Sequence, residues 1–192
     1  MFLRNTWYVA AWSKEITQEL FARTIVGESI LFYRKQDGTV VAIGNRCPHR
    51  FAPLNRGKLV DDIVQCPYHG LHFNESGICV YNPHGDGKIP KKARVPQYPL
   101  CERHDLIWLW FGEPELADES KIPDFSCLSD TQGFRTVGGI IEMHANYALI
   151  IDNLMDLTHV EYVHEGTVGN EGISDGEHVV EQYGTTVYSK LW

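Results

Sequence analysis

The sequence contains no long hydrophobic run and no excess of positive charge. Every apolar stretch is shorter than the roughly 20 residues that a membrane-spanning helix needs, and Arg4 and Asn5 interrupt the N-terminal MFLRNTWYVAAW. The 192 residues include 17 Lys and Arg against 25 Asp and Glu, which gives a net charge of -8. We therefore expect no membrane anchor, no cleaved leader and no nucleic-acid partner, and we expect the chain to be cytoplasmic.

Cysteine is sparse and odd in number, with five residues in the chain. An odd count without a secretory signal argues against a disulfide framework and favours metal binding or buried thiols. Hydrophobic residues make up 43% of the sequence, which is ordinary for a folded domain with a normal core. The length fits one domain, or one small domain and part of another.

Residues 1–112 are predicted to form an all-β domain. The β-branched and aromatic runs at 22–34 and 39–45 flank a hairpin signal at 36–38, and 106–111 is a continuous apolar run typical of a buried strand. Glycines and prolines divide the segment between 66 and 96 into short pieces.

The character of the sequence changes after this region. Residues 113–128 are acidic, contain two prolines and show no periodicity, so we predict a linker. Residues 129–192 then combine a predicted strand at 135–143, a predicted helix at 145–159 and a tail from 178 that alternates as a strand does. The fold class predicted for the whole chain is α+β.

Two short loops each offer one thiol and one imidazole. They read CPHR, with Cys47 and His49, and CPYHG, with Cys66 and His69. A [2Fe–2S] cluster held by four thiolates has a low potential, and replacing two thiolates on one iron by neutral imidazoles raises it. The mixed pairing therefore suits a one-electron carrier of moderate potential, and Pro48 in the first loop stiffens its tip.

Two alternatives to a cluster remain open from the residues alone. A structural zinc ion also takes two cysteines and two histidines, although zinc fingers usually place both cysteines in one half and both histidines in the other. A chance coincidence of unbound residues is the second alternative. The other cysteines, Cys79, Cys101 and Cys127, are expected to be small buried hydrophobes, and the remaining histidines are expected to be ordinary.

The first 110 or so residues resemble the Rieske domain of the Rieske non-haem iron oxygenases. The matching text is CPHRFAPL at 47–54 and CPYHGLHF at 66–73. The resemblance implies that Cys47 and Cys66 ligate one iron of a [2Fe–2S] cluster, and that His49 and His69 ligate the other.

A second constellation lies in DNLMDLTHVEYVH at 152–164. Carboxylates and histidines interrupt an otherwise apolar helix here, and buried charges are costly unless they are paired or bind a metal. A solvent-facing polar strip is the alternative. On an ideal helix His164 would lie about 140° from His159, at ~100° per residue, so a shared metal requires a distorted helix.

This segment is similar to the catalytic-iron segment of the same family. NTWYVA at 5–10 and YNPHG at 81–85 add a resemblance to the branch of vanillate O-demethylase oxygenase and dicamba monooxygenase. It implies that His159 and His164 bind mononuclear Fe(II), with a carboxylate completing a triad whose open positions take O2. That carboxylate lies beyond Trp192 in the family, so we expect a partial catalytic domain of the helix-grip type.

The resemblance also implies roles for two neighbours of the iron. Asp156 would accept a bond from His159, which fixes the imidazole ring, and another from the cluster histidine of a neighbouring subunit, here His69. Electrons would then cross between chains, which implies a homotrimer. Asn153 lies beside the site and is expected to support it.

The function implied is that of an oxygenase component. It would O-demethylate a methoxylated, vanillate-like aromatic acid with O2 and electrons that come from NAD(P)H through a separate flavin or ferredoxin-type reductase. No Gly-rich nucleotide loop occurs in the chain. The alternatives are a ring-hydroxylating dioxygenase alpha subunit and a Rieske electron-transfer protein without catalytic iron.

Overall fold

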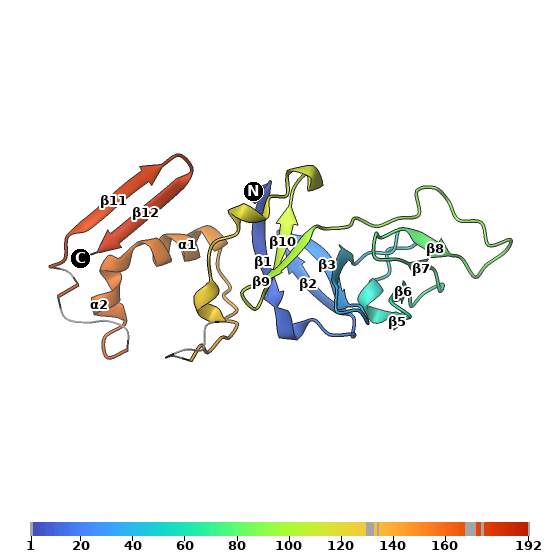
Figure 1. Ribbon diagram of the computed structural model, residues 1–192, viewed down its shortest axis with the longest axis horizontal. Coiled ribbons are helices and arrows are strands. Elements are labelled where there is room, and N and C mark those ends of the chain that lie inside the picture. Colours follow the sequence, from blue (N-terminus) through green and yellow to red (C-terminus); the bar gives the residue numbers. More distant parts are fainter. Residues whose placement is uncertain (1, 130–132, 134, 168–171, 174, 192) are drawn as a thin grey trace. The chain divides into compact units, whose positions relative to one another are not determined.

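The strands and helices of the chain fall into two compact units. The computed structural model describes residues 2–129, 133, 135–167, 172–173 and 175–191. Its units are Met1–Val137 and Gly138–Trp192, and each is described by itself. Strands β1 to β10 belong to the first unit, and α1, α2, β11 and β12 belong to the second (Figure 1). This content confirms the α+β class.

A three-stranded antiparallel sheet forms the middle of the first unit. Its order is β2 (Phe21–Ile25), β3 (Glu28–Arg34) and β4 (Val40–Gly44). The apolar run at 22–34 therefore contains two strands, because Val26 and Gly27 both have positive φ (49° and 83°) and turn the chain back. The predicted hairpin turn at 36–38 is confirmed between β3 and β4.

Strands β3 and β4 are buried on both faces. Alternate side chains of a strand point to opposite faces, so each strand supplies two cores. Leu31 and Tyr33 of β3 enter one core, whereas Ile30 and Phe32 enter the other. The first core also contains Cys47 and Cys66, so this face of the sheet packs against both predicted ligand loops.

A second antiparallel sheet has the order β1 (Thr6–Trp12), β10 (Leu106–Phe111) and β9 (Leu100–Arg103). All six residues of β10 are buried, as its apolar run predicts. The predicted linker 113–128 forms short 3-10 turns, and its Ile122 is buried in the tryptophan-rich core of this sheet. The Trp7 indole also donates to the backbone oxygen of Asp118 at 2.8 Å.

A small four-stranded sheet of short strands carries the second predicted ligand loop and follows the first. The strands are β5 (Lys58–Val60), β6 (Ile63–Gln65), β7 (His72–Phe73) and β8 (Cys79–Tyr81), hydrogen-bonded in that order. The first loop follows β4, and the second connects β6 to β7.

The strand predicted at 135–143, a segment that spans the boundary between the two units, does not form. None of these residues is in a strand, and Val137 and Ile141 are 92% and 82% exposed. The prediction was wrong because a strand needs a neighbour to hydrogen-bond with, and none of the described residues pairs with this segment.

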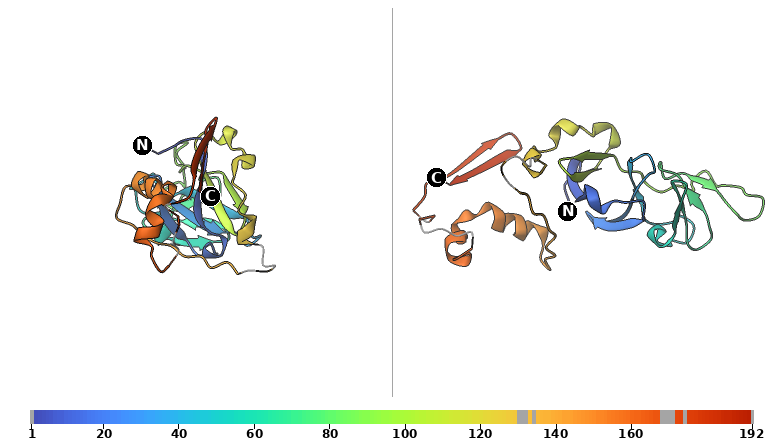
Figure 2. Two further views of the ribbon diagram at one scale, coloured as in Figure 1. Left: turned by 90° about the vertical axis from the view of Figure 1, so that its left-hand side faces the viewer. Right: turned by 60° about the horizontal axis from the view of Figure 1, so that its bottom comes forward.

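The predicted helix at 145–159 is shorter and broken. Helix α1 (Tyr147–Met155) ends at Asp156, whose backbone is extended, and a 3-10 turn and α2 (Val160–Val163) follow. The alternating tail forms a hairpin of β11 (His178–Tyr183) and β12 (Thr186–Leu191), and Trp192 lies outside the described residues. Within the second unit the hairpin lies beside α1 (Figure 2). Residues at the end of α1 and in β12 line a common pocket.

No helix among the described residues has the length and the apolar character that crossing a bilayer would require.

Candidate functional site

The two predicted ligand loops have the same backbone hydrogen bonds. In the first, the Cys47 amide donates to the Ala52 oxygen at 2.9 Å, and the Phe51 amide donates to the Cys47 oxygen at 2.9 Å. Phe51 closes this loop with a φ of 59°, in the left-handed region that a bulky side chain rarely adopts.

The second loop repeats this pattern one residue for one. The Cys66 amide donates to the Leu71 oxygen at 2.8 Å, and the Gly70 amide donates to the Cys66 oxygen at 3.1 Å. Gly70 occupies the position of Phe51 and has a φ of 66°. The two cysteines therefore start equivalent turns, and the bonds that shape each turn are local to it.

The loops bring their thiols and imidazoles into separate pairs. Cys47 and Cys66 are 1% and 3% exposed, belong to the same buried core, and form no disulfide. The rings of His49 and His69 lie 4.6 Å apart between centroids. The donor set is thus divided into two sulfurs and two imidazoles, which is the division that a Rieske cluster requires.

Burial shifts the pKa of one thiol and of one imidazole at this site. Burial raises the pKa of the Cys47 thiol to about 11, and the adjacent Cys66 contributes to the rise. Burial also lowers the pKa of His69, and the neighbouring His49, His84 and Arg50 lower it further. A neutral imidazole is the form that binds a metal.

One atom of the site lacks a partner that its burial demands. The Nδ1 atom of His69 is buried and has no hydrogen-bond partner in the described structure. A buried polar atom is normally satisfied, so an orphaned imidazole nitrogen marks a place where a further group binds. Together with two buried thiols and a second imidazole, it fits a [2Fe–2S] cluster.

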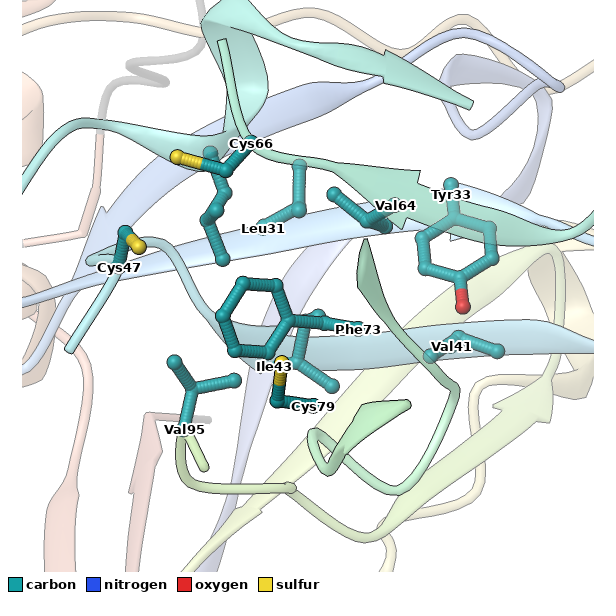
Figure 3. Packing of buried hydrophobic residues seen from close by; sticks show 11 residues of the cluster. Leu31, Tyr33, Val41, Ile43, Cys47, Val64, Cys66, Phe73, Cys79 and Val95 are labelled. Carbon is teal, nitrogen blue, oxygen red and sulfur yellow. The ribbon is translucent and has the colours of Figure 1, made fainter. Parts of the chain in front are cut away.

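The thiols are held by the core beneath them. Figure 3 shows Cys47 and Cys66 at one end of a packed group in which Phe73 lies between them and Cys79. Cys79 is a buried free thiol, as expected of a small hydrophobe, and burial raises its pKa. Cys101 is only half-buried, and Cys127 is exposed, so the expectation of burial was wrong for Cys127.

A cleft of about 570 Å³ opens beside the two histidines. Leu71 and Ile89 give it an apolar wall, and Lys88 and Lys92 contribute its charge. His84, which was expected to be an ordinary histidine, also lines the cleft. Its Nε2 lies 2.8 Å from the backbone oxygen of His69. The only sequence signal for this contact was the YNPHG stretch, to which no role was given.

The second constellation depends on the break in the helix. Because α1 ends at Asp156, the helical angle between His159 and His164 no longer applies, and their ring centroids lie 5.4 Å apart. The distortion required for a shared metal is therefore present, and both histidines are half-buried in the second unit.

Asp156 and Asn153 both lie next to His159. The Asp156 carboxylate caps the 3-10 turn by accepting bonds from the Thr158 amide and hydroxyl at 3.0 and 2.6 Å, and this hydrogen bonding lowers its pKa. It is the backbone oxygen of Asp156, not the carboxylate, that lies 2.5 Å from His159 Nδ1. The Asn153 amide nitrogen lies 3.3 Å from His159 Nε2.

Among the residues that the structure describes, no three His, Cys, Asp or Glu side chains are grouped as ligands of one metal ion. For the loops this is compatible with a Rieske cluster, in which each iron takes only two protein ligands. At His159 and His164 it leaves the carboxylate of the predicted triad without a candidate in the described part of the chain.

Comparison with known families identifies the class of protein. Residues 6–99 match the Rieske [2Fe-2S] domain, and residues 143–192 match the vanillate O-demethylase oxygenase C-terminal domain. The chain is therefore a Rieske iron–sulfur protein that continues into an oxygenase domain. It belongs to the Rieske non-haem iron oxygenases, in the branch of dicamba O-demethylase and vanillate O-demethylase.

The sequence relatives extend over most of this chain. The oxygenase component of dicamba O-demethylase from Stenotrophomonas maltophilia is 51% identical and aligns with 85% of this chain and 48% of its own. The iron-sulfur subunit of a toluene-4-sulfonate monooxygenase system from Comamonas testosteroni is 46% identical, over 100% of this chain and 54% of its own. The chain thus spans about half the length of these relatives.

A solved structure shares the fold. The crystal structure of dicamba monooxygenase bound to dicamba has a TM-score of 0.89 at 46% identity, and the match covers 97% of this chain and 55% of that one. A second structure of the enzyme, with non-heme iron and dicamba, has a TM-score of 0.83 at 44% identity, over 98% of this chain and 53% of that one. These matches support both iron cofactors predicted from the sequence.

Proposed function

We propose that this chain is the cluster-bearing part of the oxygenase component of a Rieske monooxygenase, together with the first segment of its catalytic domain. The reaction proposed is the O-demethylation of a methoxylated, vanillate-like aromatic acid. The observation that carries the proposal is the pairing of two buried thiols and two imidazoles, with one buried imidazole nitrogen unpartnered.

Each residue of the first site has a defined task in this proposal. Cys47 and Cys66 hold one iron, and His49 and His69 hold the other through neutral rings. When bound, the cluster supplies one-electron transfer, and the mononuclear iron supplies the activation of O2. Burial of the thiols in the core excludes water from the sulfur side, whereas the imidazoles face the cleft, where an electron can enter or leave.

In the second site, we assign His159 and His164 as ligands of Fe(II). Their broken helix places the rings side by side, and Asn153 keeps its amide against the His159 ring. Both capping bonds to Asp156 end on its Oδ1 atom. Within the described part of the chain these bonds leave Oδ2 available to accept from a further donor. We assign that place to His69 of a second copy, in a homotrimer.

The electrons are proposed to come from a separate NAD(P)H-dependent reductase with a flavin or ferredoxin-type centre. The sequence contains no Gly-rich nucleotide loop that would bind NAD(P)H itself. The cytoplasm is the proposed location, because the five cysteines are free thiols and a reducing compartment keeps them so.

A matched pair of cysteine variants tests the ligand assignment. Cys66→Ser should remove the visible absorption and the electron paramagnetic resonance signal of the dithionite-reduced protein, because serine offers no thiolate. Cys79→Ser changes a thiol that is equally buried in the same core and should keep both signals. An unchanged spectrum in Cys66→Ser, or zinc in place of iron in the wild-type chain, contradicts the assignment.

Two further measurements address the reaction. Iron analysis should find three irons per chain if both sites load, whereas a Rieske electron-transfer protein without catalytic iron should hold two.

Formaldehyde should be released from methoxybenzoates when a reductase and NAD(P)H are supplied to the protein together with the rest of its catalytic domain. A cis-diol product without formaldehyde would favour the ring-hydroxylating dioxygenase instead.

A further inference from the structure

We propose that His84 is a positioning residue for the second cluster loop, and that segment 82–88 exists to hold it there. The inference rests on the proposed role of His69 as a cluster ligand. It assigns a function to the YNPHG stretch, which the rest of the proposed function leaves unused.

The contact joins two segments that are separate in the sequence. The Nε2–H of His84 donates to the backbone oxygen of His69 at 2.8 Å, and the two rings lie 6.1 Å apart between centroids. The carbonyl of His69 belongs to the peptide that leads into Gly70. Fixing this peptide fixes the direction of the His69 Cβ, and with it the aim of the buried Nδ1.

A second contact supports the same loop from the same segment. A Cβ built on Gly70 would lie 3.3 Å from Cγ of Pro83, which shows that the proline ring packs directly against the turn. His84 and Pro83 therefore contact two consecutive residues of the ligand loop, one by a hydrogen bond and one by van der Waals packing.

Segment 82–88 is itself built to present His84. The Asn82 side chain accepts from the His84 amide at 3.1 Å and donates to the Lys88 oxygen at 2.9 Å. The Gly87 amide donates to the His84 oxygen at 3.0 Å, and Asp86 accepts from the Lys88 amide at 3.0 Å. These hydrogen bonds all lie within residues 82–88. They fix the backbone of His84 without using its exposed side chain.

The loop of Cys47 has the same turn and the same internal hydrogen bonds, but Phe51 stands where the second loop has Gly70. In the described part of the chain, a histidine side chain bonds to the backbone of the second loop and not to that of the first. The chain therefore contains its own control: an equivalent loop without this hydrogen bond.

Three substitutions separate the hydrogen bond from the ring. His84→Phe keeps an aromatic ring without a donor. His84→Gln places an amide nitrogen near the position of Nε2, whereas His84→Asn places it near Nδ1, too short to reach His69. We expect Gln to behave as the wild type, and Phe and Asn to behave alike as defective variants.

The first readout does not need the cluster. In the metal-free chain, amide hydrogen exchange at residues 66–71 should be about fivefold faster in the Phe and Asn variants, while exchange at residues 47–52 stays unchanged. A fivefold change corresponds to about 1 kcal/mol, the usual net contribution of one hydrogen bond. The second readout is the loaded protein, in which the same two variants should shift the midpoint potential and the g-values of the reduced cluster.

The outcomes distinguish this proposal from the proposed function. If His84→Phe matches the wild type in exchange and in both cluster readouts, or if His84→Gln is as defective as His84→Asn, the positioning role is overturned. A wild-type chain that binds no cluster refutes the ligand assignment, and the exchange experiment then still decides whether His84 holds the loop.

Discussion

The core beneath the thiols should control how long the protein retains its cluster, and Phe73→Leu tests this. Phe73 is fully buried in the same core as Cys47 and Cys66. Leucine removes three side-chain carbons, and at ~0.8 kcal/mol per buried CH2 the free energy of unfolding should fall by about 2 kcal/mol. If iron leaves through local opening of this core, its release to a chelator should be about 30-fold faster, since 1.4 kcal/mol is tenfold.

Phe32→Leu is the matched control. Phe32 is also fully buried, but it enters the core on the opposite face of the sheet, where neither ligand loop is packed. Urea unfolding, followed by tryptophan fluorescence, should show the same loss of stability in both variants. Iron release, measured anaerobically in native buffer, should be accelerated only in Phe73→Leu. Equal acceleration in both would mean that iron leaves through global unfolding, and the reasoning would fail.

Two further predictions concern the first unit. The hydrogen bond from Arg34 lowers the pKa of Glu102 despite partial burial, so the stability it contributes is present above the ordinary pKa of 4.5 and is lost as the pH falls through the lowered value. The difference in unfolding free energy between wild type and Glu102→Gln, measured by urea unfolding, should therefore shrink as the pH is lowered from 7 toward 3. At pH 7 the difference should be below about 1 kcal/mol, because the carboxylate is 41% exposed. A difference that stays constant with pH would contradict this. Gly77→Ala should lower the melting temperature far more than Gly85→Ala. Both glycines have positive φ, but only at Gly77 would a Cβ meet a backbone oxygen, that of Val95, at 2.4 Å; equal losses would contradict the steric argument.

The ligand loops could be predicted because their structure is local. Each loop is shaped by hydrogen bonds between its cysteine and the residues four and five positions later, and the thiol and imidazole are separated by only one or two residues. The buried strand at 106–111 was readable for a similar reason, since six consecutive apolar residues have no polar face to expose. The ligand roles of these residues, like the domain boundaries 1–112, 113–128 and 129–192, stay predictions.

Other features were not readable because two patterns competed. The run at 22–34 contains a hairpin whose turn includes the β-branched Val26, so Gly27 was its only turn signal within an otherwise strand-like run. The helix predicted at 145–159 is apolar on one face throughout, yet Asp156 ends it by capping the turn that follows. Capping competes with helix continuation at aspartate, and the sequence contains both possibilities.

The residue types of the two loops already define the chemistry of the first site, because they show which residues offer sulfur, which offer nitrogen, and that each loop carries one of each. Three features depend on the folded chain: the sulfurs pair in one core, the imidazoles meet at a cleft, and His84 reaches the carbonyl of His69 from fifteen residues away. The difference follows from separation along the chain. Bonds within a turn follow from a few neighbouring residues, whereas the meeting of two loops depends on how the sheets beneath them pack.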